Sequence, residues 1–215
     1  MTKNQRLATA RVALSEQRIA TMGARLGGPV AGIDEVGRGP WAGPVVAAAV
    51  VLHTLPPPGL DDSKRLSAGR REALAAELRS KAAIGIGAAE AAEIDRLGIV
   101  AATDLAMARA VAVLRTGGMN LVGALVDGKR VPMGLGIPAE PLVGADGLVA
   151  SVAAASIVAK VHRDRLMVAL DACHPGYGWA RNKGYGTLAH RAALRELGPS
   201  AQHRMSFRPI SEMEL

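Results

Sequence analysis

The sequence predicts an α/β domain with a mixed central sheet flanked by helices, and three observations lead to this fold class. Short apolar runs bounded by glycine or proline alternate along the chain with longer segments of helical periodicity. The 215 residues are 49% hydrophobic, which suffices for one domain with a buried core. That core must be aliphatic, because the chain holds only two Trp, two Tyr and one Phe. Strands interleaved with helices favour helices that cover a central sheet.

Four strands are expected. Residues 29–35 and 45–52 are short apolar runs, and the turn between them is rich in glycine and proline, so we expect them to pair as a hairpin. Residues 82–90 predict a third strand despite their glycines. The run LVGALVDG, residues 121–128, predicts a fourth strand that ends on Asp127 and a turn glycine.

Helices are expected between and after these strands. Ser67 is a suitable N-cap for the first helix, since its hydroxyl can accept a backbone N–H. Residues 99–115 repeat apolar side chains at helical spacing. A long helix rich in Ala, Val and Ile is predicted over residues 148–171, and a shorter one over residues 187–197 ends before Gly198.

Residues 1–28 carry mostly basic charges at helix-friendly spacing, which favours an N-terminal helical extension on a domain of residues 29–215. A transit peptide, or a helix lying on nucleic acid, is the alternative. The longest apolar stretches are shorter than the ~20 residues of a membrane helix, so no membrane association is expected. The single cysteine, Cys173, excludes an internal disulfide and fits a reducing compartment, so we expect a cytoplasmic protein. With no heptad pattern, we expect a monomer.

Charge favours a polyanionic partner without identifying it. Lys and Arg outnumber Asp and Glu by 26 to 19, a net charge of +7. The basic excess is concentrated between Lys160 and Arg208, in the part of the chain that also holds Tyr177, Trp179 and Tyr185.

Acidic residues stand at the ends of apolar strands, where an unpaired charge is costly. Asp34 and Glu35 interrupt the first strand, Asp127 closes the fourth, and Asp146 precedes the long helix. Buried carboxylates need basic neighbours or a metal ion. Because no His or Cys lies near them, their oxygens favour Mg²⁺ or Mn²⁺ over zinc. For Asp146 alone, capping of the long helix is an equal alternative.

The direction of Glu35 is left open. Adjacent strand residues point to opposite faces, so Asp34 and Glu35 cannot both reach one ion from a regular strand. Either the strand breaks at Gly37 and turns Glu35 toward the site, or Glu35 contributes from the side to a second ion.

Six sequence blocks in one order give the chain a resemblance to a known family. GIDEVGRGPWAGPV resembles the opening signature of type 2 ribonucleases H, the bacterial ribonuclease HII group. The family's later blocks are matched, in the same order, by these segments of the chain: DDSKRLS, LVDG, AASIVAKVHRDR, HPGYGW with NKGYGT, and QHRMSF. The resemblance implies a ribonuclease H-like fold and hydrolysis of the RNA strand in RNA/DNA hybrids. It also implies cleavage beside a single ribonucleotide in duplex DNA, leaving 5′-phosphate and 3′-hydroxyl ends.

The resemblance also implies which residues act. Asp34, Glu35 and Asp127 match the family's metal-holding acids, and Asp146 matches its fourth catalytic acid. Gly144 stands where the family often has lysine. From these acids we infer two-metal phosphodiester hydrolysis with Mg²⁺ or Mn²⁺, the ions being ~4 Å apart.

Recognition of the ribonucleotide is expected from Gly37, Arg38, Gly39 and Tyr185, which match the segments that the family uses at the RNA–DNA junction. Glycines let the backbone approach a ribose 2′-hydroxyl closely, although a tight turn would also need them.

Further substrate contacts are expected from basic side chains, whose alternative is an ordinary solvated surface. Tyr177 and Trp179 fit stacking on substrate and packing in the core equally well. Asp164 could be another metal ligand, but the neighbouring Arg163 and Arg165 favour a salt bridge or a supporting role behind the ligands. The histidines are interpreted as structural. The candidate phosphate contacts are Lys64, Lys160, Lys183 and Arg204.

Two other functions compete with the hybrid-specific nuclease. One is a related metal nuclease that cuts another nucleic acid, which would cleave all-DNA duplexes. The other is a nucleic-acid-binding protein without catalysis, against which the presence of all four acids counts.

Overall fold

The computed structural model describes residues 16–212 and contains a five-stranded mixed sheet in the order β3-β2-β1-β4-β5. β1 pairs antiparallel with β2, as the hairpin prediction required, and parallel with β4. β4 in turn pairs parallel with β5. The strands are β1 (Val30–Val36), β2 (Val45–Leu52), β3 (Ala82–Ala89), β4 (Gly123–Asp127) and β5 (Ala139–Leu142).

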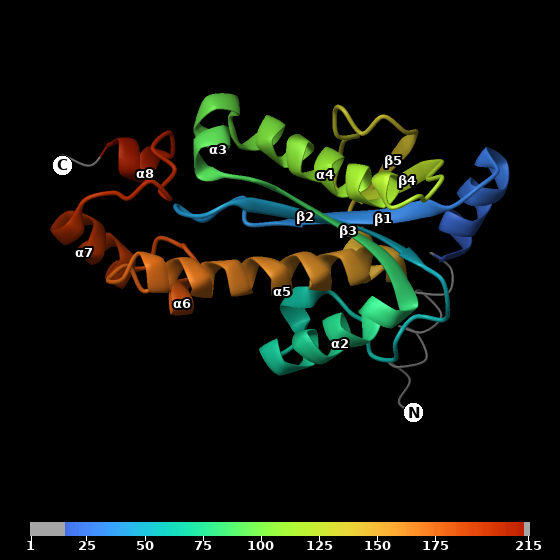
Figure 1. Cartoon of the computed structure of the whole chain (residues 1–215), viewed down its shortest axis with the longest axis horizontal. Helices are drawn as coiled ribbons and strands as arrows, with labels where there is room; N and C mark the ends of the chain where they lie inside the picture. The colour runs from blue at the N-terminus through green and yellow to red at the C-terminus, as the bar shows by residue number, and fades with distance from the viewer. Residues whose placement is uncertain (1–15, 213–215) are drawn as a thin grey trace.

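Helices cover both faces of this sheet: α4 lies on one face, and α5 lies on the other with α2 packed against it (Figure 1). None of the helices in residues 16–212 is long and apolar enough to cross a membrane. The longer helices are α2 (Ala68–Lys81), α3 (Ala91–Leu97), α4 (Ile99–Thr116), α5 (Ala150–Cys173) and α7 (Leu188–Leu197). The short ones are η1 (Ser63–Arg65), η2 (Ala145–Gly147), α6 (Trp179–Asn182) and α8 (Arg208–Ser211).

Small residues let the helices lie directly on the strands. A Cβ at Gly85 would be 2.1 Å from the Ala110 carbonyl oxygen of α4, and one at Gly87 would be 2.2 Å from that of Ala106. These glycines weaken β3 by propensity, yet they allow a close helix approach that larger side chains would block. On the other face, a Cβ at Gly32 would be 2.5 Å from the Ser151 carbonyl carbon of α5.

Besides the short elements η1, η2, α6 and α8, one strand and one longer helix were not predicted from the sequence. β5 contains Pro141, which argues against a strand but is tolerated here because β5 is an edge strand. α3 begins with a reciprocal capping box between Glu90 and Glu93 and ends at Gly98. Its seven residues were too few to give a clear period, although the capping pair was visible in the sequence.

Residues 16–26 form a helix, as expected for part of the N-terminal extension, while residues 1–15 lie outside the described part. Met22 is buried, and Arg25 forms a 2.6 Å ion pair with Glu140 of β5. The Glu16 carboxylate accepts a 3.0 Å hydrogen bond from the Ser151 backbone N–H in the first turn of α5. This helix therefore packs on the sheet domain and supplies a carboxylate to a helix N-terminus.

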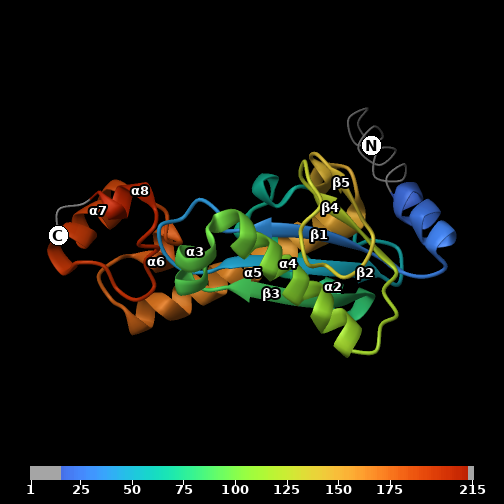
Figure 2. The same cartoon turned by 90° about the horizontal axis from the view of Figure 1, so that it is seen from above.

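The C-terminal segments gather around the turn between β1 and β2 (Figures 1 and 2). Trp41 N–H donates to the Gly184 carbonyl and Gly43 N–H to that of Gln202, both at 2.8 Å. Tyr177 and Trp179 are 7% and 0% exposed and stack at 5.0 Å between ring centroids. Core packing is thus the correct alternative for these two aromatic residues.

Two buried histidines join this C-terminal core. His203 Nδ1 accepts the Ser200 N–H at 2.9 Å, so its Nε2 carries the proton and donates to His190 Nε2 at 3.0 Å. His190 Nδ1 then donates to the Tyr185 carbonyl at 3.0 Å. Both rings are neutral in this arrangement, and burial, followed by the neighbouring His190, lowers the pKa of His203 to about 4.

Acid should therefore destabilise the protein through His203. The unfolded chain binds more protons between the ordinary pKa of 6.5 and the folded value of about 4, so stability is lost as pH falls through that window. We expect melting temperatures of His203→Gln to depend less on pH there than those of the wild type. His53→Gln, at an exposed position, is the control. Equal pH dependence in His203→Gln and the wild type would contradict this account.

Candidate active site

The parallel strands bring the predicted acids to one edge of the sheet. Because β1, β4 and β5 run in the same direction, their carboxyl ends lie together. Ile33 pairs with Val126, which sets Asp34 and Asp127 at the next step of both strands. The chain then leaves β5 for η2, where Asp146 lies.

Alternation along the strands divides these acids between the two faces of the sheet. Ile33 packs in the cluster that includes α4, so Glu35 shares that face. Asp34 points to the α5 face, where it meets Ser156. β1 stays regular through Val36, since Glu35 pairs with Ala47 in the ladder. β1 does end before Gly37, but Glu35 keeps its ladder pairing and is not turned toward Asp34. Of the two alternatives, the approach from the side is the one that fits this geometry.

Asp34 is held in a nearly closed environment. Its side chain is buried, and its Oδ1 accepts the Glu35 N–H at 2.8 Å. Burial, followed by the charge of Glu35, raises the pKa of Asp34 well above its usual value, while a hydrogen bond from Ser156 opposes the rise. Ser156 is itself 2.9 Å from the Ser63 hydroxyl, which connects Asp34 to η1.

Asp127 and Asp146 face this environment from β4 and η2. Asp127 Oδ1 accepts the Ala145 N–H at 2.8 Å, which fixes η2 against the end of β4. Asp146 is buried, and burial, followed by the charge of Asp127, raises its pKa. Asp146 does not cap the long helix, since the N-cap position of α5 is Val149. The capping alternative for Asp146 is therefore wrong.

Glu35 is less enclosed. Burial raises its pKa, while Arg38, whose Nη1 lies 3.4 Å from Glu35 Oε1, opposes that rise. The charge of Asp127 raises it further, so Glu35 belongs to the same repelling group although it faces the other side of the sheet.

This donor set fits divalent cations that prefer oxygen ligands. The pKa values of Asp34, Glu35 and Asp146 are all raised by burial and by neighbouring carboxylates. The site therefore lacks the positive charge that would balance its carboxylates. Within residues 16–212, no three His, Cys, Asp or Glu side chains converge as the ligands of one ion. The carboxylates are thus neighbours at one sheet edge without forming a closed cage.

Lys64 supplies part of the missing charge. Its Nζ is 3.7 Å from Asp146 Oδ2, although the side chain is 83% exposed. Burial lowers the pKa of Lys64, but Asp62, Asp146 and the two strand-end aspartates outweigh that effect and the net shift is upward. Lys64 therefore remains a cation that can face both the acids and a phosphate.

The predicted ribose-binding segment lies beside Tyr185. Gly37 is buried with φ of +92°, whereas Arg38 and Gly39 are exposed. A Cβ at Gly39 would be 3.7 Å from Cε1 of Tyr185, whose side chain is 45% exposed. Gly39 and the Tyr185 ring therefore border one surface.

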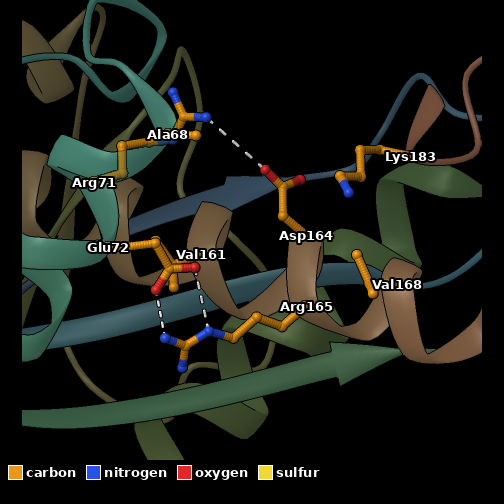
Figure 3. Close-up of a pocket in the computed structure, with 8 residues that line it drawn as sticks. All are labelled: Ala68, Arg71, Glu72, Val161, Asp164, Arg165, Val168 and Lys183. Carbon is orange, nitrogen blue, oxygen red and sulfur yellow. Dashed lines mark hydrogen bonds and ion pairs between the residues drawn. The ribbon is translucent and has the colours of Figure 1, made fainter. Parts of the chain in front are cut away.

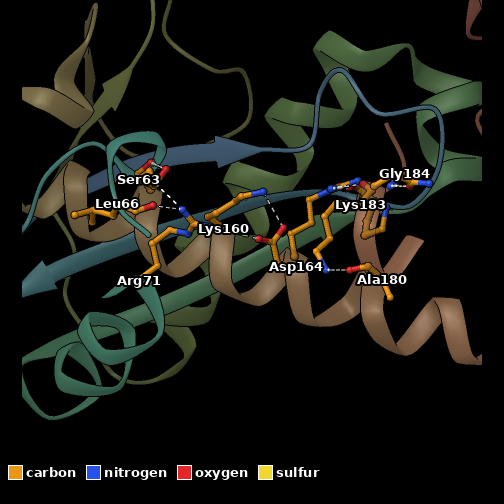
Figure 4. Close-up of polar contacts among 12 residues, drawn as sticks. Ser63, Leu66, Arg71, Lys160, Asp164, Ala180, Lys183 and Gly184 are labelled. Atoms are coloured by element: carbon orange, nitrogen blue, oxygen red, sulfur yellow. Dashed lines mark hydrogen bonds and ion pairs between the residues drawn. The ribbon is translucent and has the colours of Figure 1, made fainter. Parts of the chain in front are cut away.

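Two other predicted phosphate contacts, Lys160 and Lys183, are half-buried and make polar contacts with neighbouring residues (Figure 4). Lys160 Nζ is 2.8 Å from Asp164 Oδ1, and Lys183 Nζ donates to the Ala180 carbonyl. Lys183 also has the left-handed backbone, φ of +53°, that makes it unique among the non-glycine residues described. Arg204 is 0% exposed, so its interpretation as a phosphate contact is wrong.

Asp164 is a salt-bridge residue, but not with the partners expected. It pairs with Lys160 and, at 4.0 Å, with Arg71 of α2. Arg165 instead pairs with Glu72, and these pairs line a pocket of about 300 Å³ between α2 and α5 (Figure 3). Arg71 and Arg165 are paired with acids in this pocket, and Lys183 Nζ donates to the Ala180 carbonyl, so we interpret the pocket as a structural junction between two helices.

Comparison with known proteins agrees with the sequence blocks. The family model for Ribonuclease HII matches residues 31–210. Ribonuclease HII of Halorhodospira halophila is 56% identical over 185 residues, covering 86% of this chain and 94% of the relative. Ribonuclease HII of Jannaschia sp. is 54% identical over 189 residues, covering 87% and 94%.

Solved structures agree on the fold. Ribonuclease HII from Archaeoglobus fulgidus, solved in a PCNA complex, has a TM-score of 0.70 at 30% identity and covers 83% of this chain and 95% of its own. A Bst-RNase HIII structure in complex with Mn²⁺ gives a TM-score of 0.66 at 19% identity, covering 85% of this chain and 68% of its own.

The sheet order, the helices on its two faces and the acids at its edge define a ribonuclease H-like nuclease. The chain belongs to the ribonuclease HII family. It is accordingly a hydrolase, an endoribonuclease of the ribonuclease H type that acts on RNA/DNA hybrids.

Proposed function

We propose that this endonuclease also cuts beside single ribonucleotides in duplex DNA, by two-metal hydrolysis with Mg²⁺ or Mn²⁺. The observation that carries the proposal is that Asp34 of β1 and Asp127 of β4 meet at the sheet edge. The chain leaves β1 directly into the exposed residues Arg38 and Gly39. The Mn²⁺ bound in the Bst-RNase HIII structure is in keeping with a divalent ion at such a site.

The acids have distinct parts in this proposal. Asp34 and Asp127 hold the ions, and their orientations are fixed by the Glu35 and Ala145 N–H groups respectively. Glu35 contributes from the side, and Asp146 completes the set from η2. When bound, divalent ions activate a water and stabilise the leaving 3′ oxygen. Until they bind, the clustered carboxylates repel the phosphodiester backbone.

Ribose recognition belongs to the segment that follows. The exposed backbone of Arg38 and Gly39 can hydrogen bond a 2′-hydroxyl, the group that distinguishes RNA from DNA. Tyr185 borders the same surface and stacks on the sugar or base at the junction. Lys64 and Lys183 contact phosphates. Lys160 contacts a phosphate once its ammonium group leaves the Asp164 carboxylate.

Tyr185→Ala should weaken cleavage at a single ribonucleotide while leaving the fold intact. Loss of an aromatic stacking contact is expected to lower kcat/KM by about 5- to 150-fold, the equivalent of roughly 1–3 kcal/mol. Tyr185→Phe keeps the ring and should retain most activity, because the stacking contact is made by the ring. Unchanged kcat/KM in Tyr185→Ala would remove Tyr185 from the recognition surface.

The proposed function is tested by cleavage of three matched labelled duplexes. One is an RNA/DNA hybrid, one is DNA with a single ribonucleotide, and one is all DNA, each with Mg²⁺, Mn²⁺ or chelator. We expect metal-dependent cutting of the first two and none of the third. Cutting of the hybrid alone would refute the single-ribonucleotide activity. Equal cutting of all-DNA duplex would favour the broader metal nuclease, and binding without cutting would favour the non-catalytic alternative.

A further inference from the structure

Two arginines are buried in this molecule without a carboxylate partner. Arg163 and Arg204 are both 0% exposed, and neither forms a salt bridge with an acid of residues 16–212. Burial, followed by repulsion from Arg163, lowers the pKa of Arg204 to about 9, so it stays charged near neutral pH. A buried guanidinium is costly unless its donors are all satisfied, and hydrophobic residues would fill such a position at less cost.

The donors of these arginines go to backbone carbonyls of the β1–β2 turn. Arg204 donates from Nε and Nη2 to the Gly43 oxygen at 3.0 and 2.8 Å. Its Nη2 also donates to the Gly37 oxygen at 2.6 Å, and its Nη1 to the Arg38 oxygen at 3.0 Å. Arg204 therefore holds both peptide carbonyls on either side of the Arg38 α-carbon.

Arg163 holds the opposite side of the same turn. It donates to the carbonyls of Pro44 at 2.9 Å, Ala42 at 3.1 Å and Lys183 at 3.0 Å. Figure 4 shows the Lys183–Gly184 backbone at this junction. Arg163 thus joins the β1–β2 turn to the loop that carries Tyr185, but none of its hydrogen bonds reaches the Gly37 or Arg38 carbonyl.

The direction of the two carbonyls fixes the direction of two N–H groups. In a trans peptide the C=O and N–H point in opposite directions, and no cis peptide occurs in the described residues. With the Gly37 and Arg38 carbonyls turned inward to Arg204, the N–H groups of Arg38 and Gly39 point away from it. Neither N–H donates to an acceptor in residues 16–212, and both residues are exposed.

We propose that Arg204 is a positioning residue for ribose recognition, which presents the Arg38 and Gly39 N–H groups as a preset pair of donors. This inference rests on the proposed function, because the 2′-hydroxyl is the acceptor that the pair receives. Arg204 does not touch the substrate. It removes the freedom of the two peptide groups to rotate, which a flexible glycine turn would otherwise keep.

The test measures binding selectivity rather than cleavage. In an Asp127→Asn background with chelator, which prevents cutting, Kd is measured for DNA duplexes with and without a single ribonucleotide. The selectivity is the ratio of the two Kd values. Arg204→Met should reduce that ratio about tenfold or bring it to one, the effect of losing one or two hydrogen bonds, while the Kd for all-DNA duplex changes little. Arg204→Lys, which keeps the charge and part of the donor set, should recover part of the selectivity.

Leu194→Ala is the matched control, because Leu194 is a fully buried residue of the same C-terminal core whose side chain has no donor for the turn carbonyls. It should lower the melting temperature and leave selectivity unchanged. Circular dichroism establishes that each variant is folded, and if Arg204→Met is unfolded, Arg204→Lys decides. Wild-type selectivity in a folded Arg204→Met variant overturns the proposal. If Arg204→Met does not fold, wild-type selectivity in a folded Arg204→Lys variant that has lost the hydrogen bonds to the turn carbonyls overturns it. Absence of selectivity in the wild-type Arg204 protein would instead refute the proposed ribose recognition.

Discussion

Asp127→Asn is expected to abolish metal-dependent cleavage. Loss of a residue that hydrogen bonds to a metal ligand lowers metal affinity or activity about 10- to 100-fold. Removal of the charge of a ligand itself should therefore lower kcat by more than about 100-fold. The substitution keeps an oxygen that can accept the Ala145 N–H, now 2.8 Å from Asp127 Oδ1, and the fold should survive. Initial rates on the single-ribonucleotide duplex, at several Mn²⁺ concentrations, measure the effect.

Thermal stability in chelator separates loss of chemistry from loss of structure in this variant. Because the neighbouring acids Asp34 and Asp146 are destabilised by the charge of Asp127, Asp127→Asn should melt at the same temperature as the wild type or higher. Mn²⁺ should raise the melting temperature of the wild type more than that of the variant. Near-wild-type rates in Asp127→Asn would remove Asp127 from the metal site.

Gly37→Ala is expected to destabilise the protein severely. Gly37 has φ of +92°, and a Cβ there would lie 2.2 Å from Arg163 Nε and 2.9 Å from the Pro44 carbonyl oxygen. A strained non-glycine backbone costs roughly 1–3 kcal/mol, and displacement of a buried guanidinium adds to it. We expect a loss of about 3 kcal/mol or more in the free energy of unfolding, measured by urea denaturation.

Gly69→Ala provides the comparison for Gly37→Ala. Gly69 lies in α2 without positive φ, and a Cβ there would meet no atom within 4 Å. Alanine is the better helix former, so this variant should be neutral or slightly more stable. Similar denaturation midpoints for Gly37→Ala and Gly69→Ala would mean that Arg163 and the turn adapt freely, contrary to the packing described.

Much of the fold could be predicted from local pattern. The four predicted strands and the helices α2, α4, α5 and α7 all form, because each combines an apolar run with a clear boundary such as Ser67 or Gly198. β5 was missed because its pairing is decided by the neighbouring β4, while Pro141 argues against a strand locally.

For the candidate site, the sequence predicted which acids lie at the ends of strands. Acids at the ends of apolar strands predicted that Asp34 and Asp127 would meet, and the parallel register brings them together. The face of Glu35 required the regular pairing of β1 through Val36. Arg204 could not be placed from the sequence, since a basic residue in a basic segment looks like a surface residue. Only the folded chain brings it to the carbonyls of a turn 161 or more positions away.

The ends of the cut strand test the central claim most directly, that the acids at the sheet edge hold metal ions for hydrolysis beside a ribonucleotide. A DNA duplex with one ribonucleotide is cut in the presence of Mg²⁺ or Mn²⁺, and the products are mapped and mass-analysed. Hydrolysis by an activated water predicts one cut next to the ribonucleotide, with a 5′-phosphate and a free 3′-hydroxyl. A 2′,3′-cyclic phosphate, formed without metal by attack of the ribose 2′-hydroxyl, would contradict it.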